Sequence, residues 1–108
     1  MENKYKVIAV YKRPSEENQE AFDSHYNEVH APLTLKIPGM KEFRVNKITG
    51  GPTGQSDLYM IAEMVFENKE TWKNAMQSPE MMASGKDAMK FAGELVSVHF
   101  AKEEITHL

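Results

Sequence analysis

The chain has 108 residues, with 13 basic and 16 acidic side chains, four histidines and a formal net charge of −3. Its length allows one hydrophobic core, the absence of cysteine excludes disulfides and thiolate chemistry, and the dispersed basic residues disfavour a nucleic-acid-binding protein. No apolar run approaches the roughly 18 residues of a membrane span and no signal-peptide pattern is present, so we expect a cytoplasmic protein without a membrane segment.

The first predicted strand spans 5–11, a run rich in β-branched and aromatic residues. Ser15 is a favourable N-cap, and the two glutamates that follow it suit the first turn of a helix. Apolar residues at three- and four-residue spacing continue this helix from Phe22 onwards. Because the residue before a proline is disfavoured in the helical region, the helix is predicted to stop at Ala31–Pro32, with a second stop at 37–39.

Capping residues, glycine and proline divide the rest of the chain. Asn68 is predicted to cap a second helix, Ser78 to restart it before a proline, and Gly93 to end it. The remaining elements are strands at 40–49, 58–66 and 95–101 and a glycine-rich loop at 50–57. The order β-α-β-β-α-β predicts a single α+β domain over 1–108. Its fold would be ferredoxin-like, a four-stranded antiparallel sheet with both helices on one face.

The two strands predicted at 5–11 and 58–66 are apolar on both sides, although this topology supplies helices for only one side of the sheet. Glu63 is the one ionisable residue in the second of these strands. A large exposed apolar face is unusual in a monomer. We therefore expect a second copy of the chain to cover it through the same face, giving a homodimer in which the two sheets form a barrel-like sandwich. The alternation does not decide which face is the covered one.

Candidate functional side chains gather at the predicted helix end, within 25–39. His30, a neutral imidazole near pH 7, is a candidate general base; the alternative is a structural histidine that binds the last carbonyls of the helix. Tyr26 lies four residues earlier and shares its helix face. It could orient the imidazole or bind a substrate carbonyl, or only pack. His30 and Tyr26 are the candidate catalytic residues.

Four further residues are candidates for ligand binding: Tyr11, His25, Tyr59 and His99. The two tyrosines punctuate apolar strands and could present hydroxyls to an interior ligand. His99 is structural unless its strand face lines that interior. His25 and His30 are five residues apart, about 500° on an α-helix, so their rings are predicted to lie apart. We therefore expect no metal site. The glycine-rich loop at 50–57 fits neither a phosphate-binding loop nor a dinucleotide fingerprint, so we expect no cofactor, and no nucleophile–base–orienter set is recognisable.

A further pattern combines the first helix with the two turns that follow it: Ser15-Glu16-Glu17, Phe22, Tyr26, Val29, His30-Ala31-Pro32-Leu33 and Ile37-Pro38-Gly39-Met40. This pattern resembles the EthD family, named after ethyl tert-butyl ether degradation, in the dimeric α+β barrel superfamily. The resemblance implies ferredoxin-like subunits paired through their sheets, and it matches His30 to the family histidine. It also implies a catabolic role linked to an oxidoreductase such as a cytochrome P450 system. Related barrels include cyclases, isomerases, cofactor-free monooxygenases and haem-binding enzymes.

Three functions follow as hypotheses. The first is proton transfer by His30 on a hydrophobic small molecule held inside the dimer, as part of a cofactor-free oxidation, cyclisation or isomerisation. The second is a non-catalytic accessory protein that binds a hydrophobic metabolite and delivers it to a redox or oxygenase partner. The third is a haem-binding barrel.

Overall fold

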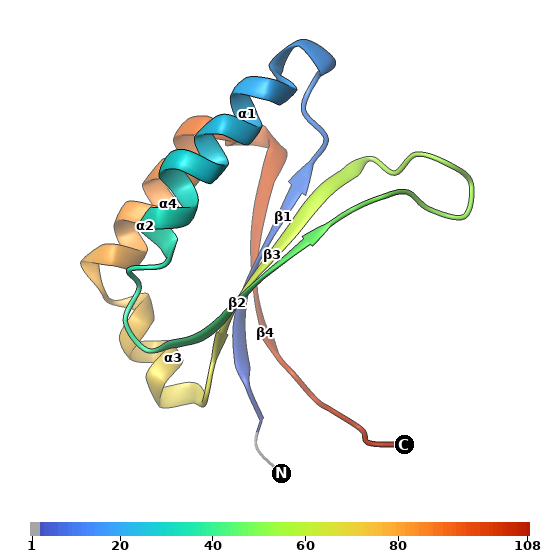
Figure 1. Ribbon diagram of the computed structural model, residues 1–108. Helices are drawn as coiled ribbons and strands as arrows, with labels where there is room; N and C mark the ends of the chain where they lie inside the picture. Colours follow the sequence, from blue (N-terminus) through green and yellow to red (C-terminus); the bar gives the residue numbers. More distant parts are fainter. Residues whose placement is uncertain (1–2) are drawn as a thin grey trace.

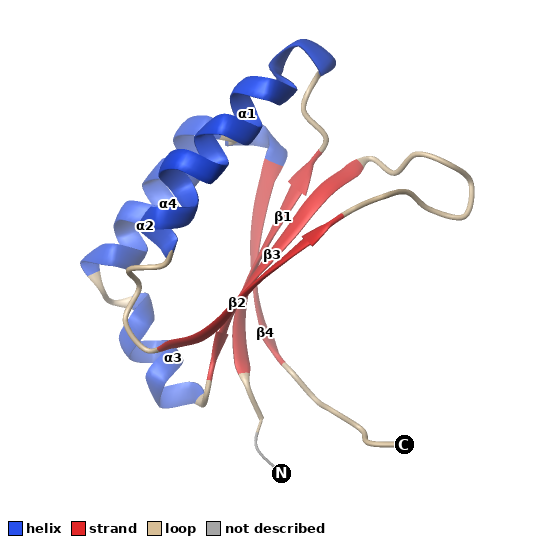
Figure 2. Cartoon of the chain, viewed as in Figure 1, coloured by secondary structure: helices blue, strands red, loops and turns tan. Residues whose placement is uncertain are grey.

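The computed structural model describes residues 3–108, so that positions 1 and 2 of the predicted domain lie outside the described part. The elements are β1 (Tyr5–Lys12), α1 (Gln19–His25), α2 (Ala31–Thr34), β2 (Met40–Lys47), β3 (Leu58–Phe66), α3 (Lys69–Met76), α4 (Pro79–Phe91) and β4 (Val96–Lys102). The strands form one antiparallel sheet in the order β2-β3-β1-β4. All helices lie on one face of it (Figure 1, Figure 2). The predicted ferredoxin-like α+β fold is confirmed. None of the helices in residues 3–108 is both long and apolar enough to span a bilayer.

Local capping places the second helical segment as predicted. The side chain of Asn68 accepts a hydrogen bond from the backbone N–H of Thr71 at the start of α3. Ser78 does the same for Met81 at the start of α4, so each helix begins where an orphan N–H finds a side-chain oxygen. Gly93, with φ of +50°, follows the end of α4 in a left-handed conformation, which glycine adopts without steric cost.

The predicted helix stop at Ala31–Pro32 is wrong. Ala31 has helical φ and ψ of −60° and −46°, and the helix that begins with α1 continues through a π-turn at Tyr26–His30 into α2. The N–H of Ala31 donates to the carbonyl of Tyr26, five residues back. A proline ring normally clashes with the carbonyl four residues earlier. The wider turn immediately before Pro32 relieves that clash, and the chain leaves the helix after Thr34.

The core lies between the sheet and the helices. Alternate strand residues face the helices, and the buried side chains on this side are Val7, Ala9, Tyr11, Met60, Ala62, Met64 and Phe66 from the strands, with Phe22, Tyr26, Ile37, Ala75, Ala88 and Ala92 from the helices and turns. This arrangement decides which face of the sheet is covered.

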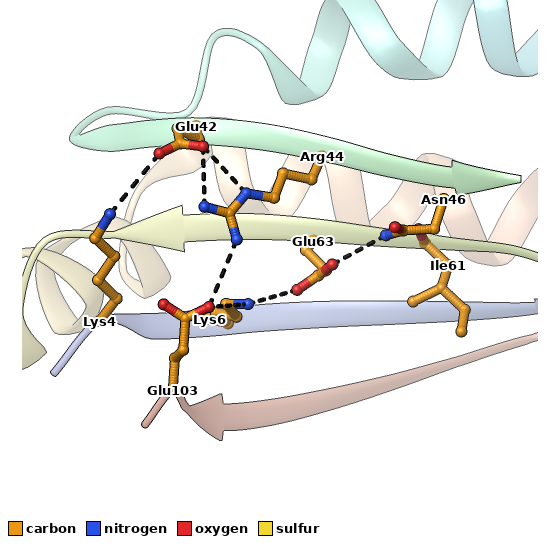
Figure 3. Close-up of polar contacts among 8 residues, drawn as sticks. All are labelled: Lys4, Lys6, Glu42, Arg44, Asn46, Ile61, Glu63 and Glu103. Atoms are coloured by element: carbon orange, nitrogen blue, oxygen red, sulfur yellow. Dashed lines mark hydrogen bonds and ion pairs between the residues drawn. The ribbon is translucent and has the colours of Figure 1, made fainter. Parts of the chain in front are cut away.

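The opposite face of the sheet is not apolar throughout, which corrects the expectation from the sequence. Its apolar residues include Ile8, Val10, Ile61 and Val65, but charged side chains from all four strands and their ends form a network beside them (Figure 3). Lys6 Nζ lies 2.6 Å from Glu63 and 2.7 Å from Glu103. Arg44 lies 3.0 Å from Glu42 and 3.5 Å from Glu103. The ion pairs allow these charges to lie beside the apolar residues of this face.

Candidate functional site

Two histidines of the first helix and one aspartate of α4 meet on the helical side of the sheet. Nδ1 of His30 lies 2.9 Å from Oδ2 of Asp87. Nε2 of His25 lies 2.8 Å and 3.0 Å from the two oxygens of the same carboxylate. His30 is 4% exposed. The chain thus builds a buried imidazole whose orientation is set by a carboxylate.

The prediction that the rings of His25 and His30 lie apart is wrong, because it assumed 3.6 residues per turn. The π-turn falls between the two histidines, and in an i→i+5 turn residues five apart return to the same side. The ring of Phe91 packs against both, with centroids 4.7 Å from His25 and 5.0 Å from His30. The π-turn therefore brings both rings to one face of the helix.

Asp87 is the residue of the candidate site that was not predicted from the sequence. It lies in α4, 57 positions from His30. One signal was present: Asp87 is three residues after the buried Ser84 and four before Phe91, so helical spacing places an acidic side chain on the inward face of α4.

Burial keeps His30 neutral near pH 7 in spite of the nearby carboxylate. Burial lowers the pKa of His30 below its usual value, and this outweighs the hydrogen bond and charge of Asp87, which raise it. Burial alone would raise the pKa of Asp87, but the hydrogen bonds from His25 and His30 hold it below its usual value. Near pH 7 the carboxylate is ionised and accepts a hydrogen bond from Nδ1–H of His30, so Nε2 carries the lone pair.

Three hydroxyl groups surround this lone pair or pack beside it. The hydroxyls of Tyr11 and Thr34 each lie 3.5 Å from Nε2 of His30, and Tyr26 packs on the imidazole with ring centroids 5.6 Å apart. Burial raises the pKa of Tyr11, and it raises that of Tyr26 to about 12. Both phenols stay protonated at neutral pH, so each hydroxyl has a proton that it can donate.

A cavity of about 370 Å³ lies between the first helix and strands β2 and β3. We call it the ligand cavity, and its lining includes Phe22, Asp23, Tyr26, Asn27, Ala31, Phe43, Val45, Lys47, Ile48, Tyr59 and Met60. The hydroxyl of Tyr59 donates to Asp23 at 2.7 Å across one side. The buried hydroxyl of Tyr26 has no hydrogen-bond partner among the described residues. The cavity is thus mostly apolar, with a few polar groups, as small-molecule sites are.

The predicted site residues fall into three places. His25 and His30 bind the carboxylate of Asp87, and Tyr11 and Tyr26 lie beside the imidazole of His30. Tyr59 lines the ligand cavity instead. His99 is exposed on the other face of the sheet, 2.9 Å from Ser97, and does not join the cluster.

No metal site is indicated by the described side chains, and His30 is not placed to ligate a haem iron. Within residues 3–108 no group of three or more histidine or acidic side chains is arranged to hold a metal ion. His30 does not present itself as an axial haem ligand, because Nδ1 binds Asp87 and Nε2 is buried beside Tyr11 and Thr34.

Comparisons with known proteins give a consistent result. The profile of the EthD domain matches residues 15–94. A Rhodococcus erythropolis protein, described as an uncharacterized 11.0 kDa protein in the thcB-thcC intergenic region, is 34% identical over 100 residues, which cover 93% of this chain and 95% of that one. The crystal structure of an EthD family protein from Bacillus halodurans is 44% identical with a TM-score of 0.87, covering 94% of this chain and 99% of the other.

The fold extends to more distant proteins. SnoaB, a cofactor-independent oxygenase from Streptomyces nogalater, has a TM-score of 0.63 at 10% identity, covering 100% of this chain and 97% of its own. At this identity the likeness shows a shared fold.

Proposed function

The chain belongs to the EthD family, and on that basis we propose that it binds an apolar small molecule in the ligand cavity and transfers a proton from it with His30 as general base. The observation that carries this proposal is the neutral, buried imidazole of His30 with Nδ1 fixed by Asp87 at 2.9 Å. A carboxylate in this position orients a histidine base and stabilises the imidazolium that it becomes.

The chemistry starts at Nε2 of His30, which accepts a proton from an acidic C–H or O–H of the ligand. Asp87 stabilises the resulting positive charge. The protonated hydroxyls of Tyr11 and Tyr26 are the available donors for the negative charge that develops on the ligand oxygen. Removal of such a proton is a step shared by isomerisation, cyclisation and cofactor-free oxidation, and the fold likeness to a cofactor-independent oxygenase supports this class.

Tyr26 connects the cavity with the base. It lines the ligand cavity, packs on His30 and has a hydroxyl without a partner among the described residues. A buried hydroxyl of this kind favours a ligand that bonds it. The size of the cavity suits a molecule of one or two rings with a carbonyl or hydroxyl group.

Deuterium exchange tests the proposal without knowledge of the product. The protein is incubated in D₂O with a panel of one- and two-ring carbonyl compounds and phenols, and deuterium incorporation into carbon is followed by mass spectrometry. We expect faster exchange of at least one compound with the wild type and none above background with His30→Gln. The exposed His107 supplies a control, His107→Gln, which should exchange as the wild type does. Exchange that persists in His30→Gln excludes His30 as the base.

A second candidate function is binding without chemistry, with delivery of the ligand to a redox or oxygenase partner. It is favoured by one observation: His30 is 4% exposed and is not part of the lining of the ligand cavity. In that case a compound from the panel binds stoichiometrically and with equal affinity to the wild type and to His30→Gln. Neither protein then speeds up the incorporation of deuterium into the bound compound.

The assembly that we propose is a homodimer through the uncovered sheet face. Its apolar residues include Ile8, Val10 and Ile61, and its network pairs three cations with three carboxylates, so an identical face meets it without net repulsion (Figure 3). Sedimentation should give a dimer for the wild type and a monomer for Ile61→Lys. Met89, exposed on the helical side, is the matched control, and Met89→Lys should stay dimeric. A monomeric wild type would contradict this assembly.

A further inference from the structure

One carboxylate oxygen joins the two histidines of the site. Oδ2 of Asp87 lies 2.9 Å from Nδ1 of His30 and 3.0 Å from Nε2 of His25. The side chain of His30 is 5% exposed, whereas that of His25 is 31% exposed. A buried imidazole is therefore connected, through a single atom, with an imidazole that reaches solvent.

His25 also reaches solvent at a different place from the ligand cavity. It lines a second, more open hollow of about 480 Å³, together with residues such as Pro14, Phe91 and Leu95. Phe22 is the one residue that the linings of the two cavities share. A proton that leaves by way of His25 thus does not have to pass through a ligand that fills the ligand cavity.

We propose that His25 is the solvent-side end of a proton path from His30 through Asp87, by which the buried base exchanges protons with water. This inference rests on the proposed function for its purpose, because a base that has taken a proton from a ligand must lose it again before the next turnover. The geometry itself, two imidazoles on one carboxylate oxygen, does not depend on which ligand is bound.

The path moves one proton at each step. His30 accepts the ligand proton at Nε2 and becomes an imidazolium, and its Nδ1 proton moves to Oδ2 of Asp87. At rest Nε2–H of His25 binds the carboxylate, so His25 first moves its proton to Nδ1 by exchange with water, and the neutral carboxyl group then donates to the free Nε2. His25 releases its Nδ1 proton to water, which leaves Asp87 ionised again and both imidazoles neutral with a proton on Nε2. Before the next turnover the proton of His30 has to return from Nε2 to Nδ1. One proton has moved from ligand to solvent, and no redox step is involved.

A purely structural role for His25 predicts something different. The ring would then only hold Asp87 in place by its hydrogen bonds and by stacking on Phe91, with centroids 4.7 Å apart. Glutamine retains an N–H that can donate to the carboxylate but has no titratable nitrogen. In His25→Gln the side chain can therefore still hold Asp87 by a hydrogen bond, but it can no longer accept a proton from Asp87 and pass it on.

The first measurement needs no ligand. With ¹⁵N-labelled histidine, the exchange rate of the His30 Nδ1 proton with water is measured by NMR in the wild type and in His25→Gln. We expect exchange at least ten times slower in the variant. A rate equal to that of the wild type would overturn the proton path.

Two further variants keep this result interpretable. His25→Ala is measured with and without added imidazole, which the hollow beside residue 25 can admit, and imidazole should restore the exchange rate. His107→Gln should exchange as fast as the wild type, because His107 is exposed in the C-terminal tail. Slow exchange in His25→Ala that imidazole does not relieve would count against a relay and for a structural role.

The failure of this inference and the failure of the proposed function are distinguishable. The exchange of the His30 Nδ1 proton could be slower in His25→Gln although the wild type deuterates no compound of the panel. This result would support the proton path and reject His30 as a base that acts on a ligand. If His25→Gln deuterates a ligand at the wild-type rate, the result supports His30 as the base and rejects the proton path through His25. If both hold, His25→Gln lowers the deuteration rate at saturating ligand and leaves the dissociation constant unchanged.

Discussion

His30 and Asp87 are 57 positions apart in the chain and meet through a hydrogen bond of 2.9 Å between Nδ1 and Oδ2. His30 belongs to the first β-α-β half of the fold and Asp87 to the second. The bond therefore ties the two helical segments together above the sheet. It also sets the tautomer of the imidazole, so one contact serves both the fold and the proposed chemistry.

Replacing Asp87 by asparagine should separate these two roles. The amide oxygen of Asp87→Asn can still accept from Nδ1–H, but the variant no longer stabilises an imidazolium. We expect the deuteration rate to fall by about 100-fold or more, with ligand affinity nearly unchanged. Glu80, another acidic residue of α4, gives the matched control Glu80→Gln, which should keep the full rate. A rate in Asp87→Asn within a factor of two of the wild type would contradict the role of the carboxylate.

Stability should fall on acidification in a window set by His30. Its pKa is lowered in the folded protein from the ordinary 6.5, so the unfolded chain binds a proton at about pH 6.5 while the native state does so only at lower pH. The free energy of unfolding therefore decreases as the pH falls from about 6.5 to the native pKa of His30 and levels off below it. Each unit of lowering corresponds to about 1.4 kcal/mol.

His30→Gln removes this titration, and urea denaturation between pH 4 and 8 measures the difference. The variant should show a smaller loss of stability over the window than the wild type. Identical pH profiles for the two proteins would mean that the imidazole is not held neutral by burial.

Gly39 should not tolerate a side chain. Its φ is +76°, and an added Cβ would meet the Cγ2 of Thr71 at 2.6 Å, so Gly39→Ala combines backbone strain with a clash. We expect a loss of more than about 1 kcal/mol. Gly85 lies within α4 with no atom within 4 Å of an added Cβ, and Gly85→Ala should gain about 0.5–1 kcal/mol. Thermal unfolding of both variants measures the contrast, and a shift of the same sign in the two would refute it.

The network on the uncovered face should depend on Lys6, whose Nζ bridges two carboxylates. Lys6→Met leaves Glu63 and Glu103 facing each other without that cation. Because all three side chains are largely but not fully buried, we expect a loss of about 1–3 kcal/mol. Adding Glu63→Gln should recover part of it. A double variant no more stable than Lys6→Met would show that the two carboxylates do not repel.

Much of the fold could be predicted because its signals are local. Asn68 and Ser78 cap the helices that they were expected to cap, and the strand at 58–66 has the predicted bounds. Two members of the candidate site, His30 and Tyr26, could be named from the sequence, but the carboxylate that binds His30 does not follow from the residues around them. Asp87 reaches His30 only through the packing of α4 on the first helix, and no local pattern encodes that contact.

The π-turn was missed for a different reason. The spacing of apolar residues was compared with an α-helix of 3.6 residues per turn, and this comparison does not reveal a single turn whose hydrogen bond spans five residues. Pro32, which was predicted to end the helix, lies within it, immediately after the π-turn. A proline at this position is therefore compatible with a widened turn before it.

This turn also makes the first helix tolerant to a change of length. Histidines four apart on a regular α-helix lie within about 40° of each other, so a chain lacking Asn27, which is exposed within the turn, could keep both rings on one face without the π-turn. What such a deletion would lose is the room for the ring of Pro32. Pairing the deletion with Pro32→Ala should therefore restore a regular helix around an intact histidine pair. The π-turn thus accommodates one extra residue between His25 and His30 while both imidazoles stay on the same face of the helix.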